Sequence, residues 1–357
     1  MVARPESEEE TPGGWFAVAF GKDVPAGRVA RSEIGGRELV VYRTGRGDIK
    51  VISPYCPHLG AHLGYGGRVR DEEIVCPFHG FAFGPGGACT ATGNGAKPPK
   101  ISLTSWPSRE VGGLVLAWRH PAGLGPQWEP DDMPGAYPYP VHTSYLERIR
   151  LNDVGENSVD LGHFTHVHKA VRPEVMQGFT TDGHRAGGTL RASVVTLPAR
   201  PPVEVHFSFR YWGMGLLVID FEPVRWPVRV RLVIAATPAG RGSVRLRVST
   251  SAAIEPEGMV AFASPRARRV LAAGVARAVD GWVQRGLRDD IVIWTHKTFL
   301  DRPRLADGDQ GIAAWRRWVR QFYELDPAPK EVPAPAPALG VPEFGGRAAG
   351  ERREDAR

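Results

Sequence analysis

Two short segments, CPHLG from residue 56 and CPFHG from residue 76, constrain the fold of this 357-residue chain more than any other feature. One residue separates Cys56 from His58, two separate Cys76 from His79, and seventeen lie between the two pairs. The side chains of such a close pair can face one metal atom, on Pro- and Gly-containing turns that flanking strands hold rigid. The segments therefore predict a metal site.

The ligand types leave two kinds of site open. A structural zinc site of the Cys2His2 type is one, although zinc fingers usually pair cysteine with cysteine and histidine with histidine. Mixed pairs instead match a [2Fe-2S] cluster in which Cys56 and Cys76 hold one iron and His58 and His79 hold the other. Cys89 is the third and last cysteine. Three thiols cannot build a disulfide framework, and a reducing compartment would leave them available for metal.

The pattern C-x-H, seventeen residues, C-x-x-H resembles a Rieske domain. High-potential respiratory Rieske proteins usually carry one more cysteine in each loop, and Ala61 and Phe78 stand at those positions here. The resemblance therefore implies a cluster of the lower-potential kind that oxygenases and their ferredoxins carry.

The chain divides into parts of different character. Short apolar runs alternate with Gly and Pro turns over residues 14–120, which predicts an all-β domain. A Pro- and Gly-rich linker over residues 121–140 precedes a second domain at 141–325. We expect the ends, residues 1–13 and 326–357, to be disordered.

Hydrophobic periodicity defines the second domain. The segment VEVHFSFRYW, residues 203–212, alternates strictly and predicts an antiparallel strand with one covered face. The segment after Ser264 has a helical period, and its expected apolar stripe comprises Val270, Leu271, Val275, Val279, Trp282 and Val283. The fold class is therefore α+β. The resemblance adds that the second domain is a helix-grip, START-like catalytic domain.

A second cluster of ligand-type residues lies in NSVDLGHFTHVH, residues 157–168, which we expect to be helical. Asp160 and His163 are neighbours on one helix face, so the carboxylate can accept from the imidazole nitrogen that faces away from a metal. His168 lies about 140° further around an ideal helix. Both histidines reach one metal only if the helix bends or breaks. Taken alone, they are also compatible with a polar helix face.

Together with the upstream loops, D-x-x-H-x-x-x-x-H resembles the mononuclear iron motif of Rieske non-haem iron oxygenases. Asp160, His163 and His168 stand at the matching positions, whereas His166 does not. Such oxygenases hold Fe(II) with two histidines and one carboxylate, leaving positions open for dioxygen.

The carboxylate ligand is expected from a distant segment, QRGLRDDIVIW. Asp290, followed by I-V-I-W, matches the D-x-x-I-W pattern that the resemblance predicts. The alternative is Asp289, for which a solvated position beside Arg288 is the better interpretation.

The resemblance also implies partners. In a head-to-tail homotrimer, Asp160 would bridge the partner subunit's His79 and His163 of its own chain. Electrons would come from NAD(P)H through a reductase to the [2Fe-2S] cluster and then to Fe(II), which activates dioxygen. No Gly-rich dinucleotide fingerprint follows a strand in this chain, so the reductase has to be a separate protein.

Composition excludes other classes of function. No run of eighteen apolar residues occurs, so we expect no membrane span. The net charge of +6 comes from scattered Lys and Arg rather than a stripe interleaved with aromatic residues, which argues against nucleic-acid binding. The polar first residues lack an apolar secretory segment, which predicts a cytoplasmic protein.

By its motifs the chain is most similar to the oxygenase components of 3-ketosteroid 9-alpha-hydroxylases and to cholesterol 7-desaturases. It departs from them at Phe81, where a Trp is common. The expected function is hydroxylation or desaturation of a hydrophobic ring, most simply a steroid or sterol. The alternatives are an oxygenase for a non-steroid aromatic or natural-product intermediate, an electron-transfer protein without catalytic iron, and a zinc-stabilised binding protein.

Overall fold

The computed structural model describes residues 11–133, 137–195 and 201–323. The tail at 326–357 and most of the N-terminal segment, both expected to be disordered, lie outside this part. Residues 11–13, which we assigned to that segment, are buried. The Gly13 N–H donates to the carbonyl of Phe322 at 2.7 Å, which ties the first described residues to the last helical turn.

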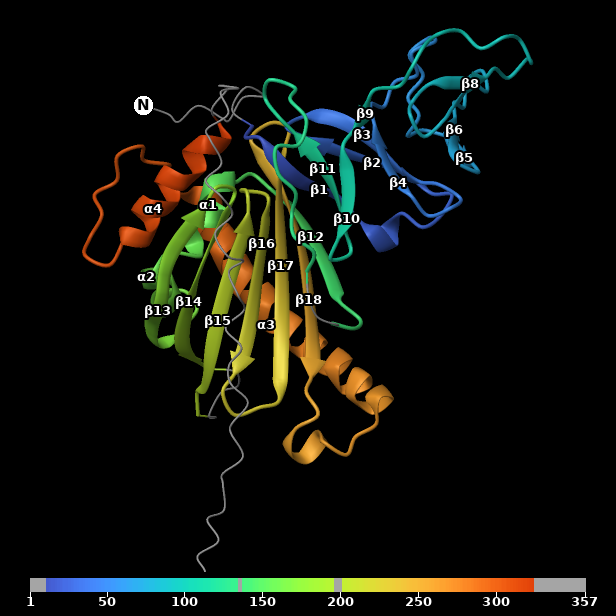
Figure 1. The fold of residues 1–357 in the computed structure, drawn as a ribbon. Helices are drawn as coiled ribbons and strands as arrows, with labels where there is room; N and C mark the ends of the chain where they lie inside the picture. The colour runs from blue at the N-terminus through green and yellow to red at the C-terminus, as the bar shows by residue number, and fades with distance from the viewer. Residues whose placement is uncertain (1–10, 134–136, 196–200, 324–357) are drawn as a thin grey trace, which may run out of the picture. The chain divides into compact units, whose positions relative to one another are not determined.

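The N-terminal part is built of three small antiparallel sheets, in the strand orders β1-β11-β10, β2-β3-β4-β9 and β5-β6-β7-β8 (Figure 1). The all-β character that the apolar runs predict is confirmed. The strands are β1 (Gly14–Phe20), β2 (Val29–Ile34), β3 (Arg37–Arg43), β4 (Ile49–Ile52), β5 (Arg68–Arg70), β6 (Glu73–Val75), β7 (Ala82–Phe83), β8 (Cys89–Ala91), β9 (Ser105–Trp106), β10 (Ser108–Val111) and β11 (Leu114–Arg119).

The C-terminal part is one seven-stranded antiparallel sheet, ordered β12-β18-β17-β16-β15-β14-β13. Its strands are β12 (Val141–Glu147), β13 (Val171–Asp182), β14 (Arg185–Val194), β15 (Val203–Trp212), β16 (Leu216–Pro223), β17 (Val228–Ala239) and β18 (Ser243–Ile254). Residues 120–133 and 137–140, before β12, carry neither helix nor strand. In β15 the alternate residues Val205, Phe207, Phe209 and Tyr211 are buried, as the period of two predicts.

Four α-helices accompany this sheet in the described residues: α1 (Leu151–Asn157), α2 (Leu161–His166), α3 (Pro265–His296) and α4 (Gln310–Val319). The short 3-10 turns are η2 (Gly21–Asp23), η3 (Gly258–Val260) and η4 (Arg320–Phe322). α3 runs across the sheet and contacts mainly β18 and β12 (Figure 1). It begins where Ser264 Oγ accepts from the Ala267 N–H and Pro265 fills the first turn.

The buried face of α3 differs from the expected stripe at its beginning. Val270 and Leu271 are 71% and 48% exposed. The small Ala272 and Ala276 instead pack against Val230 and Ala252 of the sheet. Small side chains let the first turns of the helix lie close to the sheet, so the larger ones face outward.

The two sets of sheets are joined by buried polar contacts. The guanidinium of Arg247, on β18, donates to the carbonyls of Ala17 at 2.6 Å and Val18 at 2.8 Å on β1. Thr237 Oγ1, on β17, donates to the same Ala17 carbonyl at 2.7 Å. β1 is therefore anchored to the large sheet through its backbone.

Candidate active site

The two Cys/His loops follow β4 and β6 and share one backbone pattern. In the first, the Cys56 N–H donates to Ala61 and the Gly60 N–H donates back to Cys56. In the second, the Cys76 N–H donates to Phe81 and the Gly80 N–H donates back to Cys76. Gly60 and Gly80 take left-handed φ values of 75° and 67°, which glycine adopts without steric cost.

The loops bring the four predicted cluster residues together. Cys56 and Cys76 are buried, 2% and 3% exposed, whereas the rings of His58 and His79 lie at the surface with centroids 4.9 Å apart. Burial raises the pKa of the Cys56 thiol to about 11, which favours the neutral thiol near pH 7 unless a bound metal stabilises the thiolate. Two buried sulfurs and two exposed imidazoles fit the donor set of a [2Fe-2S] cluster.

The second group of predicted residues also converges. One ligand atom from each of His163, His168 and Asp290 lies within 4.8 Å of the others. The helix expected over residues 157–168 is broken: α1 ends at Asn157 and α2 begins after Asp160. α2 ends at His166, so His168 stands beyond the helix and turns back, with ring centroids of the two histidines 4.9 Å apart.

We expected the Asp160 carboxylate to accept from the imidazole of His163, and this is wrong: the ring is bound by the backbone of Asp160 instead. Its Oδ1 accepts from the backbone N–H of His163 at 3.2 Å and so caps α2, because the residue before a helix satisfies a free backbone donor. The imidazole Nδ1 of His163 pairs with the backbone carbonyl of Asp160 at 2.6 Å. That bond fixes Nδ1 as the protonated nitrogen and leaves Nε2 free for a metal.

Asp290, rather than Asp289, faces the two histidines. It is 7% exposed, and its Oδ2 lies 3.3 Å from Nε2 of His168, whereas Asp289 is exposed. His166 is exposed as well. Burial lowers the pKa of His163, which keeps its ring neutral, the form in which imidazole binds metal. Two imidazoles and one carboxylate fit a mononuclear Fe(II).

Gly286 provides the space that His168 occupies. It lies one turn before Asp290 on α3, and a Cβ built there would stand 3.2 Å from Nδ1 of His168. The sequence does not reveal this function of Gly286, because there it is only one glycine within a helical segment.

A cavity of about 510 Å³ opens onto the three ligand-type residues. Its sheet-side wall is apolar and comes mainly from β14, β15, β16 and β17. The wall comprises Leu190, Ala192, Phe207, Phe209, Leu217, Ile219, Phe221, Leu232 and Ile234. Five of these residues lie on β15 and β16, whereas Tyr211 of β15 belongs to the core and pairs with Ser158.

Asn157 is a polar side chain of this cavity that sequence reasoning missed. It lines the cavity beside His163, and its Oδ1 accepts from the indole N–H of Trp294 at 3.1 Å. Its position three residues before Asp160, about one helical turn from the motif, is the sequence feature that indicates it.

Comparison with known proteins agrees with both halves of the chain. Residues 117–323 match the 3-ketosteroid 9alpha-hydroxylase C-terminal domain, and residues 14–107 match the Rieske [2Fe-2S] domain. Cholesterol 7-desaturase nvd 1 of Ciona intestinalis is 28% identical, over 87% of this chain and 68% of its own length. The oxygenase component of a 3-ketosteroid-9-alpha-monooxygenase from Rhodococcus rhodochrous is 26% identical, over 87% and 80%.

Solved structures share the fold. Dicamba monooxygenase bound to dicamba superposes with a TM-score of 0.61 at 19% identity, covering 87% of this chain and 96% of that one. A mutant of NdmA from Pseudomonas putida CBB5 with caffeine gives a TM-score of 0.65 at 14% identity, covering 87% and 90%. Among the described residues, the helices are too short or too polar to cross a membrane. The chain belongs to the family of the 3-ketosteroid 9alpha-hydroxylase C-terminal domain and, with its Rieske domain, is the terminal oxygenase component of a Rieske non-haem iron system, with a [2Fe-2S] cluster and a mononuclear iron as cofactors.

Proposed function

We propose that this oxygenase hydroxylates or desaturates the ring system of a steroid or sterol. One observation carries the proposal: a cavity of about 510 Å³ with an apolar wall opens onto His163, His168 and Asp290. Pockets for drug-sized ligands usually enclose roughly 300 to 1,000 Å³, and most of their lining is apolar. The relatives whose names specify a steroid or sterol substrate support the same choice.

In this proposal His163, His168 and Asp290 hold the iron. Cys56 and Cys76 hold one iron of the cluster, and His58 and His79 hold the other. When bound, these groups supply the activation of dioxygen and the delivery of electrons, taken from NAD(P)H through a partner reductase. Asp290 contributes a negative charge at a buried position, and that charge favours a cation there.

The protein's own side chains would position the substrate. The Phe207, Phe209 and Phe221 rings present flat apolar surfaces that exclude water and leave a fused ring system few orientations. At the metal end, the amide NH2 group of Asn157 is left to donate towards an oxygen atom in the cavity, because its oxygen is used by Trp294.

We further propose a head-to-tail homotrimer in which Asp160 lies between the partner subunit's His79 and its own His163. The exposed ring of His79 and the half-buried Asp160 are both accessible for such a contact. The Asp160 carboxylate, already held as the cap of α2, would add a fixed negative charge beside both imidazoles. A cluster domain at residues 14–120, a catalytic domain at residues 141–325 and a cytoplasmic location remain predictions.

The test is turnover of the purified protein with dioxygen, NADH and a generic reductase. The substrate panel contains ketosteroids, sterols and aromatic acids, and products are read by mass as the gain of an oxygen atom or the loss of two hydrogens. We expect a change of mass for at least one steroid or sterol and none for the aromatic acids. Turnover of the aromatic acids alone would replace the steroid proposal by a non-steroid one.

A binding measurement separates substrate choice from electron supply. Trp282 and Trp294 line the cavity, so a bound steroid should quench tryptophan fluorescence even in iron-free protein. Saturable quenching by ketosteroids or sterols, competed by each other but not by aromatic acids, is the expected result. A cavity that binds none of the steroids contradicts the proposal regardless of the reductase.

A further inference from the structure

One end of the large sheet carries a surface that the oxygenase reaction does not use. It is formed by the β16–β17 turn, the segment after β18 with η3, and the first turns of α3 (Figure 1). The turn and the segment lie side by side, because the Glu255 N–H donates to the carbonyl of Pro227 at 2.9 Å and Val228 pairs with Ile254. We call residues 222–229 and 255–271 the sheet-end surface.

Large apolar side chains protrude from the sheet-end surface. Phe262 is 98% exposed, Val270 71%, Trp226 56% and Val224 52%. Single exposed apolar residues are ordinary on a protein surface, but several on adjoining turns mark a site of interaction. Val224 and Trp226 project from a hairpin turn, Phe262 from a loop and Val270 from the first turns of α3, none of them lining a groove. They therefore fit the apolar interior of a membrane better than a folded partner.

The same segments are basic. Five arginines, at positions 225, 229, 266, 268 and 269, stand against three glutamates, at 222, 255 and 257. Arg229 is paired with Glu255, whereas Arg225, Arg266 and Arg269 are exposed and form no ion pair among the described residues. A net positive charge around protruding aromatic rings complements an anionic surface.

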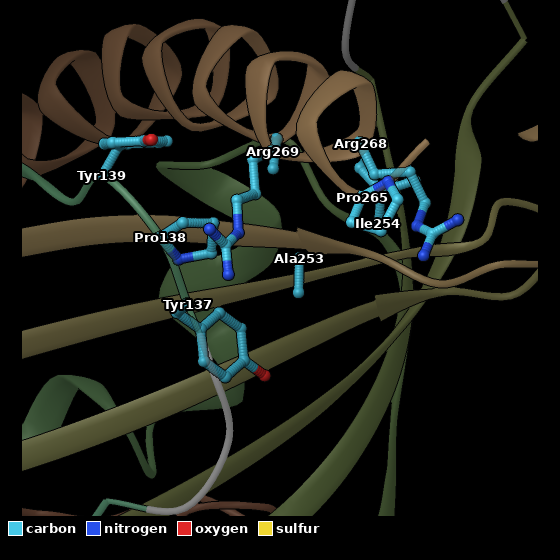
Figure 2. A pocket seen from close by; sticks show the side chains of 9 residues that line it. Tyr137, Pro138, Tyr139, Ala253, Ile254, Pro265, Arg268 and Arg269 are labelled. Carbon is cyan, nitrogen blue, oxygen red and sulfur yellow. The ribbon is translucent and has the colours of Figure 1, made fainter. Parts of the chain in front are cut away.

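A cavity of about 470 Å³ lies beside this basic cluster (Figure 2). Tyr137 and Tyr139 approach it from the segment before β12, and Arg268 and Arg269 approach it from α3. In Figure 2, Arg269 reaches from the helix towards Pro138 and Tyr137. Arg268 donates to the carbonyl of Ala263 at 2.6 Å, which connects this cavity to the loop that carries Phe262.

We propose that the sheet-end surface docks on an anionic phospholipid bilayer. Trp226 and Phe262 enter the interface, where aromatic rings are favoured. The free arginines meet lipid phosphates, and the cavity beside Arg269 receives one phosphate headgroup as a charge-assisted partner. Docking on a bilayer does not depend on the proposed substrate, although a bilayer is also where a sterol dissolves.

The experiment is flotation of the full-length holoprotein with vesicles, one set of phosphatidylcholine and one with added phosphatidylglycerol. We expect the wild type to float with the anionic vesicles only, and less at high salt. Because each basic residue near an anionic membrane contributes about 1 kcal/mol, R266Q/R268Q/R269Q should weaken partitioning at least about tenfold. W226S/F262S should weaken it by loss of the aromatic anchors.

A control carries changes of the same two kinds, basic to Gln and apolar to Ser, at another exposed segment. Arg302, Arg304 and Leu305 are exposed residues of the segment before α4, and R302Q/R304Q/L305S should float like the wild type. Retained cluster absorbance together with an unchanged content of iron in excess of the cluster shows that both parts of each variant are folded. The proposal is overturned if the wild type floats with neither kind of vesicle. It is also overturned if the control loses as much binding to anionic vesicles as the sheet-end variants do. A lower native mass of W226S/F262S overturns it as well, because it would assign the surface to a second copy of the chain.

Discussion

The indole N–H of Trp294 donates to Oδ1 of Asn157 at 3.1 Å, and both side chains line the cavity next to the candidate iron site. An indole nitrogen can only donate, so the bond fixes which end of the Asn157 amide faces the cavity. Trp294 follows Asp290 by four residues on one face of α3. One helix therefore positions both a candidate ligand and the side chain that orients Asn157.

We predict that W294F raises the KM for the steroid more than it lowers kcat. The substitution keeps an aromatic ring in the wall but removes the donor to Oδ1 of Asn157, so the amide is free to flip. An unpaired buried acceptor costs about 1 to 3 kcal/mol. The control is W282F, since Trp282 lines the same cavity and its indole has no hydrogen-bond partner among the described residues. Equal KM values for W294F and the wild type would show that the bond does not orient the substrate.

A steric prediction concerns Gly286. An added Cβ there meets the His168 ring at 3.2 to 3.3 Å, whereas nothing lies within 4 Å of a Cβ at Gly281 on the same helix. G286A should displace His168 and reduce the iron bound in excess of the cluster. G281A should keep that iron and gain up to about 1 kcal/mol of stability, because alanine favours a helix. Iron and acid-labile sulfide analyses give the iron bound in excess of the cluster. An unchanged value in G286A would show that Gly286 is not needed to position His168.

The negative charge of Asp160 can be separated from its capping function. D160N keeps a side-chain oxygen to cap α2, since asparagine caps helices as well as aspartate does. It removes the charge that the proposed bridge needs. We expect full iron and sulfide content with product formation reduced by about two orders of magnitude or more, as found when one positioned electrostatic group is lost. Full activity of D160N would exclude the bridge.

Residue types and spacing predict part of the site, and the resemblance to the oxygenase motif adds the choice of iron ligands, including Asp290. The two mixed pairs converge, the helix breaks between His163 and His168, and Asp290 is the buried carboxylate. For the two Cys/His pairs spacing indicates a metal site because both loops are short, so few geometries satisfy a shared metal, whereas the distant Asp290 rested on the resemblance.

Other features depended on contacts that spacing does not encode. The capping role of Asp160 was missed because the helix begins after it, so that its carboxylate meets a backbone N–H instead of the imidazole. Val270 and Leu271 were placed on the wrong face because α3 has apolar residues around much of its circumference at this end, and small Ala272 and Ala276 take the buried positions. The orientation of Asn157 depends on Trp294, 137 residues away.

A pH prediction follows from His184. Its ring stacks on Trp128 with centroids 4.3 Å apart, and burial lowers its pKa from 6.5 to about 4. Between these values the unfolded chain binds more protons than the folded one, so the free energy of unfolding falls as pH falls from 6.5 towards 4. H184F keeps the stacking but cannot titrate. Denaturant unfolding should show a shallower pH slope for H184F than for the wild type; identical slopes would contradict the assignment.

The most direct test of the account is the iron count of D290A and D289A beside the wild type. The cluster contributes two irons and two acid-labile sulfides, so a filled mononuclear site brings the wild type to about three irons per chain. We predict about two irons and undiminished sulfide for D290A with no steroid product, and about three irons with retained turnover for D289A. Three irons and full turnover in D290A, or loss of the third iron in D289A alone, would contradict the proposed site.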